Sequence, residues 1–229
     1  HRDLHSFPTR RSSDLVREAH GLACPVMLAM NRPYPERVRP AIEQAVADAA
    51  DRGVDGFILA DLELAAFLRR RWPHLTLVAS TYMAVFNSRA ISFAADAGFD
   101  RVVLPRPIHL DEARRIARGD GPGLEVFLAR ERCRFINAHC RTEHWAYDSG
   151  AGRMDFKVRP LCIDNLRDMD GAPAVLDDEA NMSSACGMCA IHELAGLPRI
   201  ESFKVVGRGA RIEDVLPFTH VVFDRGGVA

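Results

Sequence analysis

From Pro25 onward, short apolar runs alternate with longer stretches in which apolar residues recur at helical spacing. This alternation predicts βαβ units and a parallel sheet. Six runs are predicted to be strands, at residues 25–30, 56–59, 75–80, 101–104, 124–128 and 202–206. Five helices are predicted between them, ending near Gly53, Arg71, Gly98, Arg118 and Leu197. Asp61 stands where the second helix begins, and a short acidic side chain at that position predicts an N-cap.

The strand count indicates an incomplete barrel. A closed (β/α)8 barrel needs eight strands, because an open parallel sheet leaves edges that must be paired or covered. The alternative is a doubly wound open sheet, but no Gly-x-Gly-x-x-Gly follows any early strand. The sequence therefore predicts an α/β fold of the TIM-type (β/α)8 class that lacks about two N-terminal βα units.

The first fifteen residues do not belong to this pattern. Residues 5–15 match the conceptual translation of a common sequencing-library adapter, and a match over eleven residues is very specific. Segments of this kind are excluded from fold reasoning. We therefore predict a non-native leader at 1–15 and a single barrel domain at 16–229, as a fragment whose preceding residues are missing.

Composition and charge narrow the functional classes. Hydrophobic residues make up 48% of the 229 residues, which is ordinary for a globular domain with a sizeable core. The formal net charge is −1 without any basic run, which argues against sequence-independent binding of nucleic acid and leaves recognition of a specific RNA open. The apolar stretches are far shorter than the roughly 20 residues of a membrane span. We predict a cytoplasmic protein.

Five of the six cysteines fall in the connection between the fifth and sixth predicted strands. Cys133 and Cys140 form a Cys-x6-Cys pair, Cys186 and Cys189 form a Cys-x2-Cys pair, and Cys162 lies between the pairs. Grouped cysteines in a cytosolic chain are typically metal ligands or redox groups. Four thiolates suit either a tetrahedral zinc ion or a 4Fe-4S cluster, and spacing does not separate these metals. We predict a cysteine-rich insertion at 129–190 that binds metal, with ordinary buried thiols as the alternative.

Barrel topology predicts that the two pairs meet. The loop after each barrel strand opens on the face at the carboxyl ends of the strands, so Cys133 and Cys140 start on that face. The helix predicted at 188–197 must begin on the same face in order to lead down to the sixth strand. Cys24 precedes the first strand and belongs to the opposite end, where we expect a small buried hydrophobe.

Several segments together resemble the peptidase U32 family. Glu125-Val126-Phe127, followed by Cys133 and Cys140, resembles the family signature. Residues 59–61, 102–106 and 203–208 are similar to the strand endings that recur in it. The resemblance runs from about residue 24 to residue 208, and in the family pattern two further strands precede the first strand visible in this chain.

This resemblance implies an iron-sulfur protein, as an enzyme or an enzyme component, that supports hydroxylation of an RNA base or of an aromatic precursor, as in ubiquinone biosynthesis. It implies a 4Fe-4S cluster on Cys133, Cys140, Cys186 and Cys189, with Cys162 as an alternate ligand and zinc as the alternative metal. The expected substrate is a small molecule or RNA, and a subunit of the same family can act as partner. The alternative functions are a collagenase-like peptidase of the U32 type and a cluster- or zinc-stabilised binding module without catalysis.

Further candidates lie at or near the carboxyl ends of predicted strands, where barrels collect their substrate-binding groups. They are Asp61, Ser80, Arg106, Lys204 and Arg208. Arg106 can grip a carboxylate or phosphate, or form a structural ion pair. Asp61 can be a catalytic acid or a helix N-cap. Glu125 lies within a strand, so it is either paired in the barrel interior or a group that handles protons.

Two observations weigh against hydrolysis. A serine peptidase of the common elbow type would show Gly-x-Ser-x-Gly, and a zinc peptidase would show His-Glu-x-x-His, and the sequence contains neither.

His139 and His144 can support the metal site as hydrogen-bond donors or alternative ligands, or they can be solvated loop residues.

Overall fold

The computed structural model describes residues 10–106, 108–129 and 191–205, and six strands in this part of the chain form one sheet. The strands are β1 (Met27–Met30), β2 (Gly56–Leu59), β3 (Thr76–Ala79), β4 (Arg101–Val103), β5 (Gly123–Ala129) and β6 (Ile200–Val205). The helices are α1 (Arg10–Gly21), α2 (Arg39–Asp51), α3 (Leu62–Arg71), α4 (Ser88–Asp96), α5 (Leu110–Ala117) and α8 (Ile191–Ala195), with 3-10 turns η2 (Glu36–Val38) and η3 (Thr81–Met83). Within these described ranges no helix is long and apolar enough to cross a membrane.

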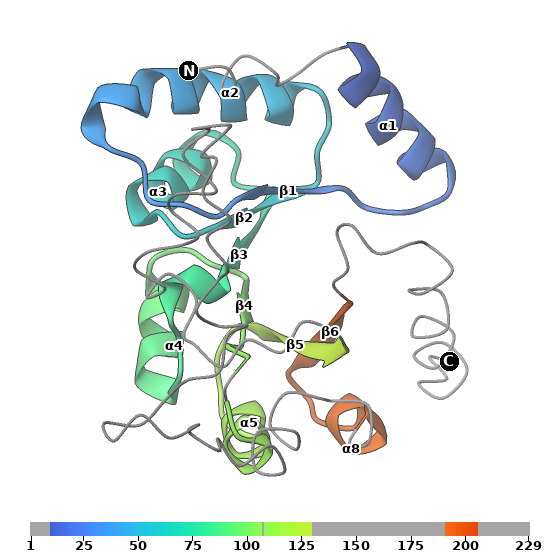
Figure 1. Cartoon of the computed structure of the whole chain (residues 1–229), viewed down its shortest axis with the longest axis vertical. Coiled ribbons are helices and arrows are strands. Elements are labelled where there is room, and N and C mark those ends of the chain that lie inside the picture. The colour runs from blue at the N-terminus through green and yellow to red at the C-terminus, as the bar shows by residue number, and fades with distance from the viewer. Residues whose placement is uncertain (1–9, 107, 130–190, 206–229) are drawn as a thin grey trace, which may run out of the picture.

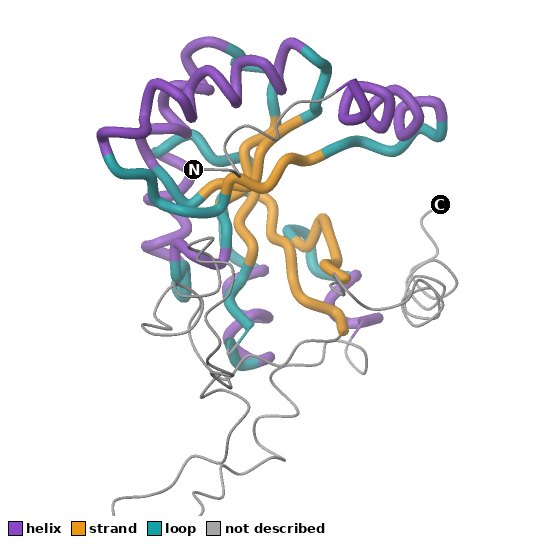
Figure 2. Tube along the Cα trace, turned by 45° about the horizontal axis from the view of Figure 1, so that its top comes forward, coloured by secondary structure: helices purple, strands orange, loops and turns teal. Residues whose placement is uncertain are grey.

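The order of the strands decides between the two predicted architectures. Each strand pairs in parallel with the next one along the chain, and the order runs from β1 to β6 without a reversal. A doubly wound sheet would require a switch point where the order reverses. Figures 1 and 2 show the strands curling as an inner layer, with the helices along the outside. The described sheet is therefore a curled, barrel-like α/β sheet that is open between β1 and β6, and closure with two more units stays a prediction.

The predicted elements agree with the structure to within a few residues. All six strands are confirmed, and their ends differ from the predicted ones by at most two residues. The helix predicted to end near Gly53 is divided into η2 and α2. β6 begins at Ile200 because pairing with β5 extends it, and the Leu124 amide donates to the Arg199 carbonyl at 2.7 Å. Glu201 is polar, so the sequence pattern did not predict that the strand extends to Ile200.

The two faces of the sheet have different partners. Alternate strand residues pack with the helices in the core. Strand residues of this outward set are Phe57, Leu59, Leu77, Ala79, Val102, Leu124 and Val126. The residues between them, such as Val103 and Glu125, lie on the inner face of the curl, and both are buried. The alternation therefore places Glu125 inside the barrel curve.

Gly56, at the start of β2, has no room for a side chain. A Cβ atom there would lie 2.1 Å from the Thr76 carbonyl oxygen of the paired strand. We expect Gly56→Ala to lower the free energy of unfolding by about 2 kcal/mol, because the obstacle is backbone and must shift. Gly123→Ala is the matched control, since the three atoms nearest to its Cβ would all belong to the end of the flexible Glu201 side chain. Urea denaturation of both variants measures the difference, and equal losses would contradict the explanation.

Residues 10–15, which were assigned to the leader, form the first half of α1. The Ser13 hydroxyl accepts a hydrogen bond from Arg52 at 3.2 Å. Val16, the first residue after the predicted leader, is buried in the core. The boundary between a non-native leader and the barrel domain stays a prediction.

Cys24 is exposed, so its prediction as a small buried hydrophobe is wrong. It follows Ala23, which has a φ of 54° and turns the chain between α1 and β1. The strand begins only at Met27, so Cys24 lies outside the sheet and does not reach the core. Its Sγ lies 3.6 Å from the carbonyl oxygen of Leu22.

Candidate functional site

Four charged side chains are linked across β4, β5 and β6, which lie side by side in Figure 1. Lys204 donates to Glu125 at 2.7 Å, and Arg101 lies 3.9 Å from the other oxygen of that carboxylate. Arg101 also donates to Glu201 at 3.2 Å. We call Glu201, Arg101, Glu125 and Lys204 the inner charge chain. It runs from the amino edge of the sheet, where β4 begins, toward the carboxyl edge.

Glu125 is the buried member of the inner charge chain, with a side chain that is only 9% exposed. Barrel interiors are normally filled by layers of apolar side chains. Burial of a carboxylate costs several kcal/mol unless opposite charges and hydrogen bonds offset it, and the ammonium of Lys204 does so here. Of the two predicted alternatives, the structure places Glu125 in the paired arrangement. Apolar side chains would stabilise this position at least as well as the charged pair does. The charged pair is therefore not needed for stability, and we take this inner face as the candidate site.

A second group of side chains lies next to this pair at the carboxyl edge. Phe127 is the register partner of Lys204, so the two residues stand abreast on β5 and β6. The Arg106 guanidinium, from the loop after β4, lies 4.5 Å from the centre of the Phe127 ring. We call Arg106, Phe127 and Lys204 the carboxyl-edge cluster. It combines two cations with an aromatic ring, a combination that suits an anionic ligand with a flat group.

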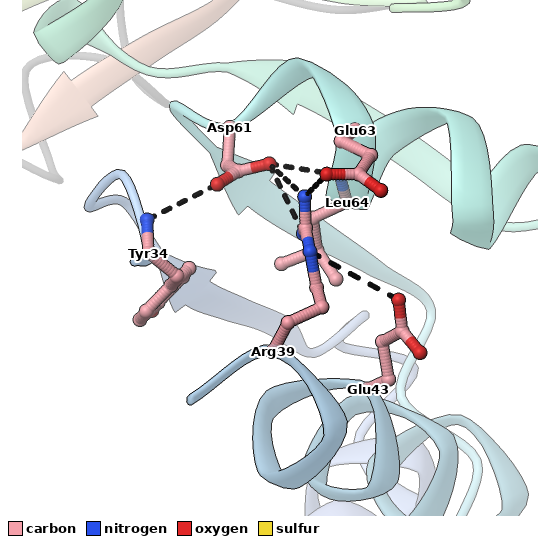
Figure 3. A network of polar contacts seen from close by, with 6 residues as sticks. All are labelled: Tyr34, Arg39, Glu43, Asp61, Glu63 and Leu64. Atoms are coloured by element: carbon pink, nitrogen blue, oxygen red, sulfur yellow. Dashed lines mark hydrogen bonds and ion pairs between the residues drawn. The ribbon is translucent and has the colours of Figure 1, made fainter. Parts of the chain in front are cut away.

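Asp61 is occupied by structural contacts, as Figure 3 shows. Its side chain accepts a hydrogen bond from the Leu64 amide at 2.9 Å, which confirms the predicted N-cap of α3. The Tyr34 amide donates to the other carboxylate oxygen at 3.1 Å, and the Arg39 guanidinium donates at 3.2 Å to the same oxygen that caps α3. Burial by itself would raise the pKa of Asp61, but these donors outweigh it and hold the pKa below its usual value. The geometry therefore assigns Asp61 the N-cap role.

The same network contains a buried arginine that the sequence reasoning missed. Arg39, at the start of α2, donates to Asp61 and to Glu63, and its Nε lies 4.0 Å from Glu43. It is buried and bridges the loop after β1 to the loop after β2. Arg39 and Asp61 are 22 residues apart in the sequence, so no local sequence pattern predicts this pair.

Ser80 and Arg199 also serve the scaffold. The buried Ser80 hydroxyl accepts a hydrogen bond from the Tyr82 amide and caps η3. Arg199 is buried beside the loop before β5, where it donates to the carbonyls of Pro122, Ile116 and Gly119. Burial lowers the pKa of Arg199 from its usual value. Sequence reasoning missed Arg199, because its partners are backbone carbonyls about 80 residues earlier.

The predicted metal site lies outside the residues that the structure describes. Its positions are Cys133, Cys140, Cys162, Cys186 and Cys189, with His139 and His144 beside them. Arg208, predicted as a substrate-binding group, also lies outside the described residues. Among the described residues, no group of three or more histidine, cysteine, aspartate or glutamate side chains is arranged to hold a metal ion. The described elements that flank the cysteine-rich connection are β5 before it and α8 after it.

Comparison with known families now decides the class of protein. A family model described as "Peptidase family U32" matches residues 2–223, which is nearly the whole chain. The chain belongs to peptidase family U32. The segment that begins at Glu125 resembles the family signature, and this resemblance and the barrel-like sheet agree with the membership.

Two curated relatives of this U32 chain bear names that describe RNA hydroxylation. The "23S rRNA 5-hydroxycytidine C2501 synthase" of Escherichia coli (strain K12) is 26% identical over 199 residues, covering 86% of this chain and 30% of the relative. The "tRNA hydroxylation protein P1" of Bacillus subtilis (strain 168) is 28% identical over 181 residues, covering 73% of this chain and 41% of the relative. The U32 chain thus spans less than half the length of the curated relatives that it matches.

A solved structure shares the fold. The structure titled "The Structure of the U32 Peptidase Mk0906" has a TM-score of 0.57 and 17% identity, covering 88% of this U32 chain and 78% of that chain. At this level of identity the similarity supports the barrel-like fold alone.

Proposed function

We propose that this U32 chain supports the hydroxylation of an RNA base. The observation that carries the proposal is the similarity to two relatives, one named for 23S rRNA and one for tRNA hydroxylation. The chain spans 30% and 41% of these relatives, so the proposed activity belongs to a longer protein of this type, as an enzyme or an enzyme component. We propose cytoplasmic RNA as the substrate and a subunit of the same family as a partner.

We also propose a 4Fe-4S cluster held by Cys133, Cys140, Cys186 and Cys189, with Cys162 as the alternate ligand. The support is chemical: four cysteine thiolates are the ligand set that such a cluster takes, although zinc takes the same set. When bound, the cluster would supply electron transfer. Among the described residues, β5 carries Glu125 and Phe127 and leads directly into the cysteine-rich connection.

Deletion of the gene in its source organism tests the hydroxylation proposal. Ribosomal and transfer RNA from the deletion strain are digested to nucleosides and analysed by mass spectrometry. We expect one nucleoside to lose a single oxygen atom relative to wild type, and the intact gene to restore it on a plasmid. Cys133→Ser should fail to restore it, whereas Cys24→Ser, at the exposed cysteine outside the proposed ligand set, should restore it. Unchanged RNA in the deletion strain would overturn the proposal.

Metal analysis separates the cluster from its alternatives. Anaerobically purified full-length protein is expected to be coloured, with iron and acid-labile sulfide present in equal amounts. A colourless protein with stoichiometric zinc would overturn the cluster. Release of peptides from gelatin that is lost when one cysteine is substituted would instead support the peptidase alternative. Metal without any activity would support the binding module, and dependence of a quinone precursor on the gene would favour the aromatic substrate.

A further inference from the structure

Lys204 carries the ammonium at the carboxyl end of the inner charge chain. Its side chain is 26% exposed, whereas the side chain of its partner Glu125 is 9% exposed. Among the residues that the structure describes, the polar contact of this ammonium is its 2.7 Å hydrogen bond to Glu125. A lysine ammonium has three hydrogens, so two of them are left to donate to a ligand or to water.

Glu125 holds this ammonium in one place. A lysine side chain is a flexible four-carbon stem that reaches toward solvent when it has no partner. Ser202, and not Lys204, is the register partner of Glu125, so the Lys204 side chain leans back along β6 to reach the carboxylate. The carboxylate itself has a second cation near it, because Arg101 lies 3.9 Å from its other oxygen. The ammonium therefore lies over the inner face instead of extending beyond the edge of the sheet.

The neighbouring strands are apolar on this inner face. The alternation described above places Ile58, Val78 and Val103 on it, and the two valines are buried. A hydrogen bond in apolar surroundings is stronger than one in water, because water competes less for the donor. Ligand sites typically combine such apolar walls with a few fixed polar groups. The Lys204 ammonium has the properties of such a fixed group.

The charges of the inner charge chain cancel, because two glutamates face one arginine and one lysine. Arg106, the other cation of the carboxyl-edge cluster, has a further interaction besides its contact with Phe127, so it contributes no surplus charge for a ligand. A full negative charge on a ligand would therefore meet no net positive charge at Lys204. An uncharged hydrogen-bond acceptor is the ligand group that suits this ammonium.

We propose that Lys204 donates a hydrogen bond to an uncharged acceptor atom of the RNA base, such as a ring carbonyl oxygen, and that Glu125 is its positioning residue. This inference rests on the proposed function, because RNA is the substrate assumed there. It adds the residue that contacts the substrate and the part of the nucleotide that is contacted.

The test is the affinity of the full-length protein for RNA and the dependence of that affinity on salt. The probe is a fluorescein-labelled single-stranded RNA of mixed sequence, about twelve nucleotides long, followed by anisotropy. Glu125→Met together with Lys204→Met removes both charges, so the net charge is unchanged and the stability is expected to be kept. This double variant should bind RNA roughly tenfold more weakly, because one charge-assisted hydrogen bond is lost.

The salt dependence distinguishes a base from a phosphate. Loss of a contact to an uncharged base should leave the slope of log affinity against log salt unchanged in the double variant. Loss of a phosphate contact would lower the slope by about 0.7 and would overturn the inference. Single-stranded DNA of the same sequence should lose affinity by the same factor, whereas a loss confined to RNA would point to the 2′-hydroxyl and would also overturn it.

The single variant Glu125→Gln tests the positioning role. It leaves Lys204 in place and adds one positive charge to the protein, which by general electrostatics strengthens RNA binding. We expect binding to weaken instead, roughly threefold, because the ammonium is no longer held over the inner face. Equal or stronger binding in protein with native circular dichroism would show that Glu125 does not position Lys204.

An exposed ion pair supplies the matched control. Glu112→Gln together with Arg115→Gln removes a pair from the surface of α5, again without a change in net charge, and should leave the affinity unchanged. Wild-type affinity in the Glu125 and Lys204 double variant would overturn the inference. An equal loss in the α5 control would overturn it as well, because the effect would then not belong to the inner face.

The outcomes also separate this inference from the proposed function. If the deletion strain lacks the hydroxylated nucleoside but the double variant binds RNA as the wild type does, hydroxylation stands and the base contact fails. If RNA modification is unchanged in the deletion strain but the affinity falls at a constant slope, the base contact stands and hydroxylation fails.

Discussion

Asp61→Ala is expected to lower the free energy of unfolding by about 3 kcal/mol. The substitution removes the N-cap of α3 and the acceptor of the Tyr34 amide. It also leaves the buried guanidinium of Arg39 without its buried partner. A buried charge that loses its partner destabilises a protein more than the pair stabilised it. Urea denaturation of the variant measures this loss.

Glu63→Ala is the matched control for Asp61. Glu63 contacts the same Arg39 guanidinium, but its side chain is 66% exposed. Exposed ion pairs contribute at most about 1 kcal/mol, so this variant should lose little stability. Equal losses in the two variants would show that burial does not set the strength of the network.

The same network gives the stability a pH dependence. The pKa of Asp61 is lower in the folded protein than its usual value, because its hydrogen-bond donors outweigh the effect of burial. Its contribution is therefore complete above about pH 4, the usual pKa of an aspartate, and is lost as pH falls through the folded pKa. The difference in stability between wild type and Asp61→Ala should narrow on acidification below that pH. A constant difference would contradict the ion-pair explanation.

Arg199→Ala is expected to cost about 3 kcal/mol of unfolding free energy, because it leaves backbone carbonyls without their donor. The guanidinium donates to Pro122 at 2.8 and 3.0 Å and to Ile116 at 3.0 Å. These bonds hold the loop between α5 and β5 against the start of β6. Hydrogen exchange should therefore show faster opening of that loop as well as lower global stability.

Two variants check the explanation for Arg199. Arg199→Lys keeps the charge but loses the planar fork of donors, so we expect it to recover only part of the stability. Arg115→Ala removes an arginine whose side chain is 75% exposed on α5 and should be nearly neutral. Full recovery by lysine would show that charge, rather than the set of hydrogen bonds, stabilises the loop.

The fold followed closely from local patterns. The apolar runs that became β2 and β4 begin at the predicted residues, and Asp61 caps α3 as its position indicated. These features depend on side-chain alternation and on short-range capping, which the sequence displays directly. The prediction that Cys24 is buried was wrong because β1 begins later than the apolar run suggested, and the start of a strand depends on the strand with which it pairs.

The candidate site was visible only in part. Glu125, Arg106 and Lys204 stood out in the sequence because they lie in or near the ends of predicted strands. Their grouping with Phe127, and the contacts of Arg101, require the register of β4, β5 and β6. Arg39 and Arg199 carried no signal, because a buried arginine looks like any surface arginine until its distant acceptors are known.

Sequence alone was sufficient for the repeating βαβ order, the membership signature around Glu125 and the clustering of the cysteines, because each of these is a property of neighbouring positions. The tertiary structure was needed to place Glu125 between Lys204 and Arg101 and to assign Asp61 its structural role as a helix N-cap. Those outcomes depend on contacts between residues that are 3 to 79 positions apart in the chain. Strand register and burial bring the distant partners together, and a linear pattern contains neither quantity.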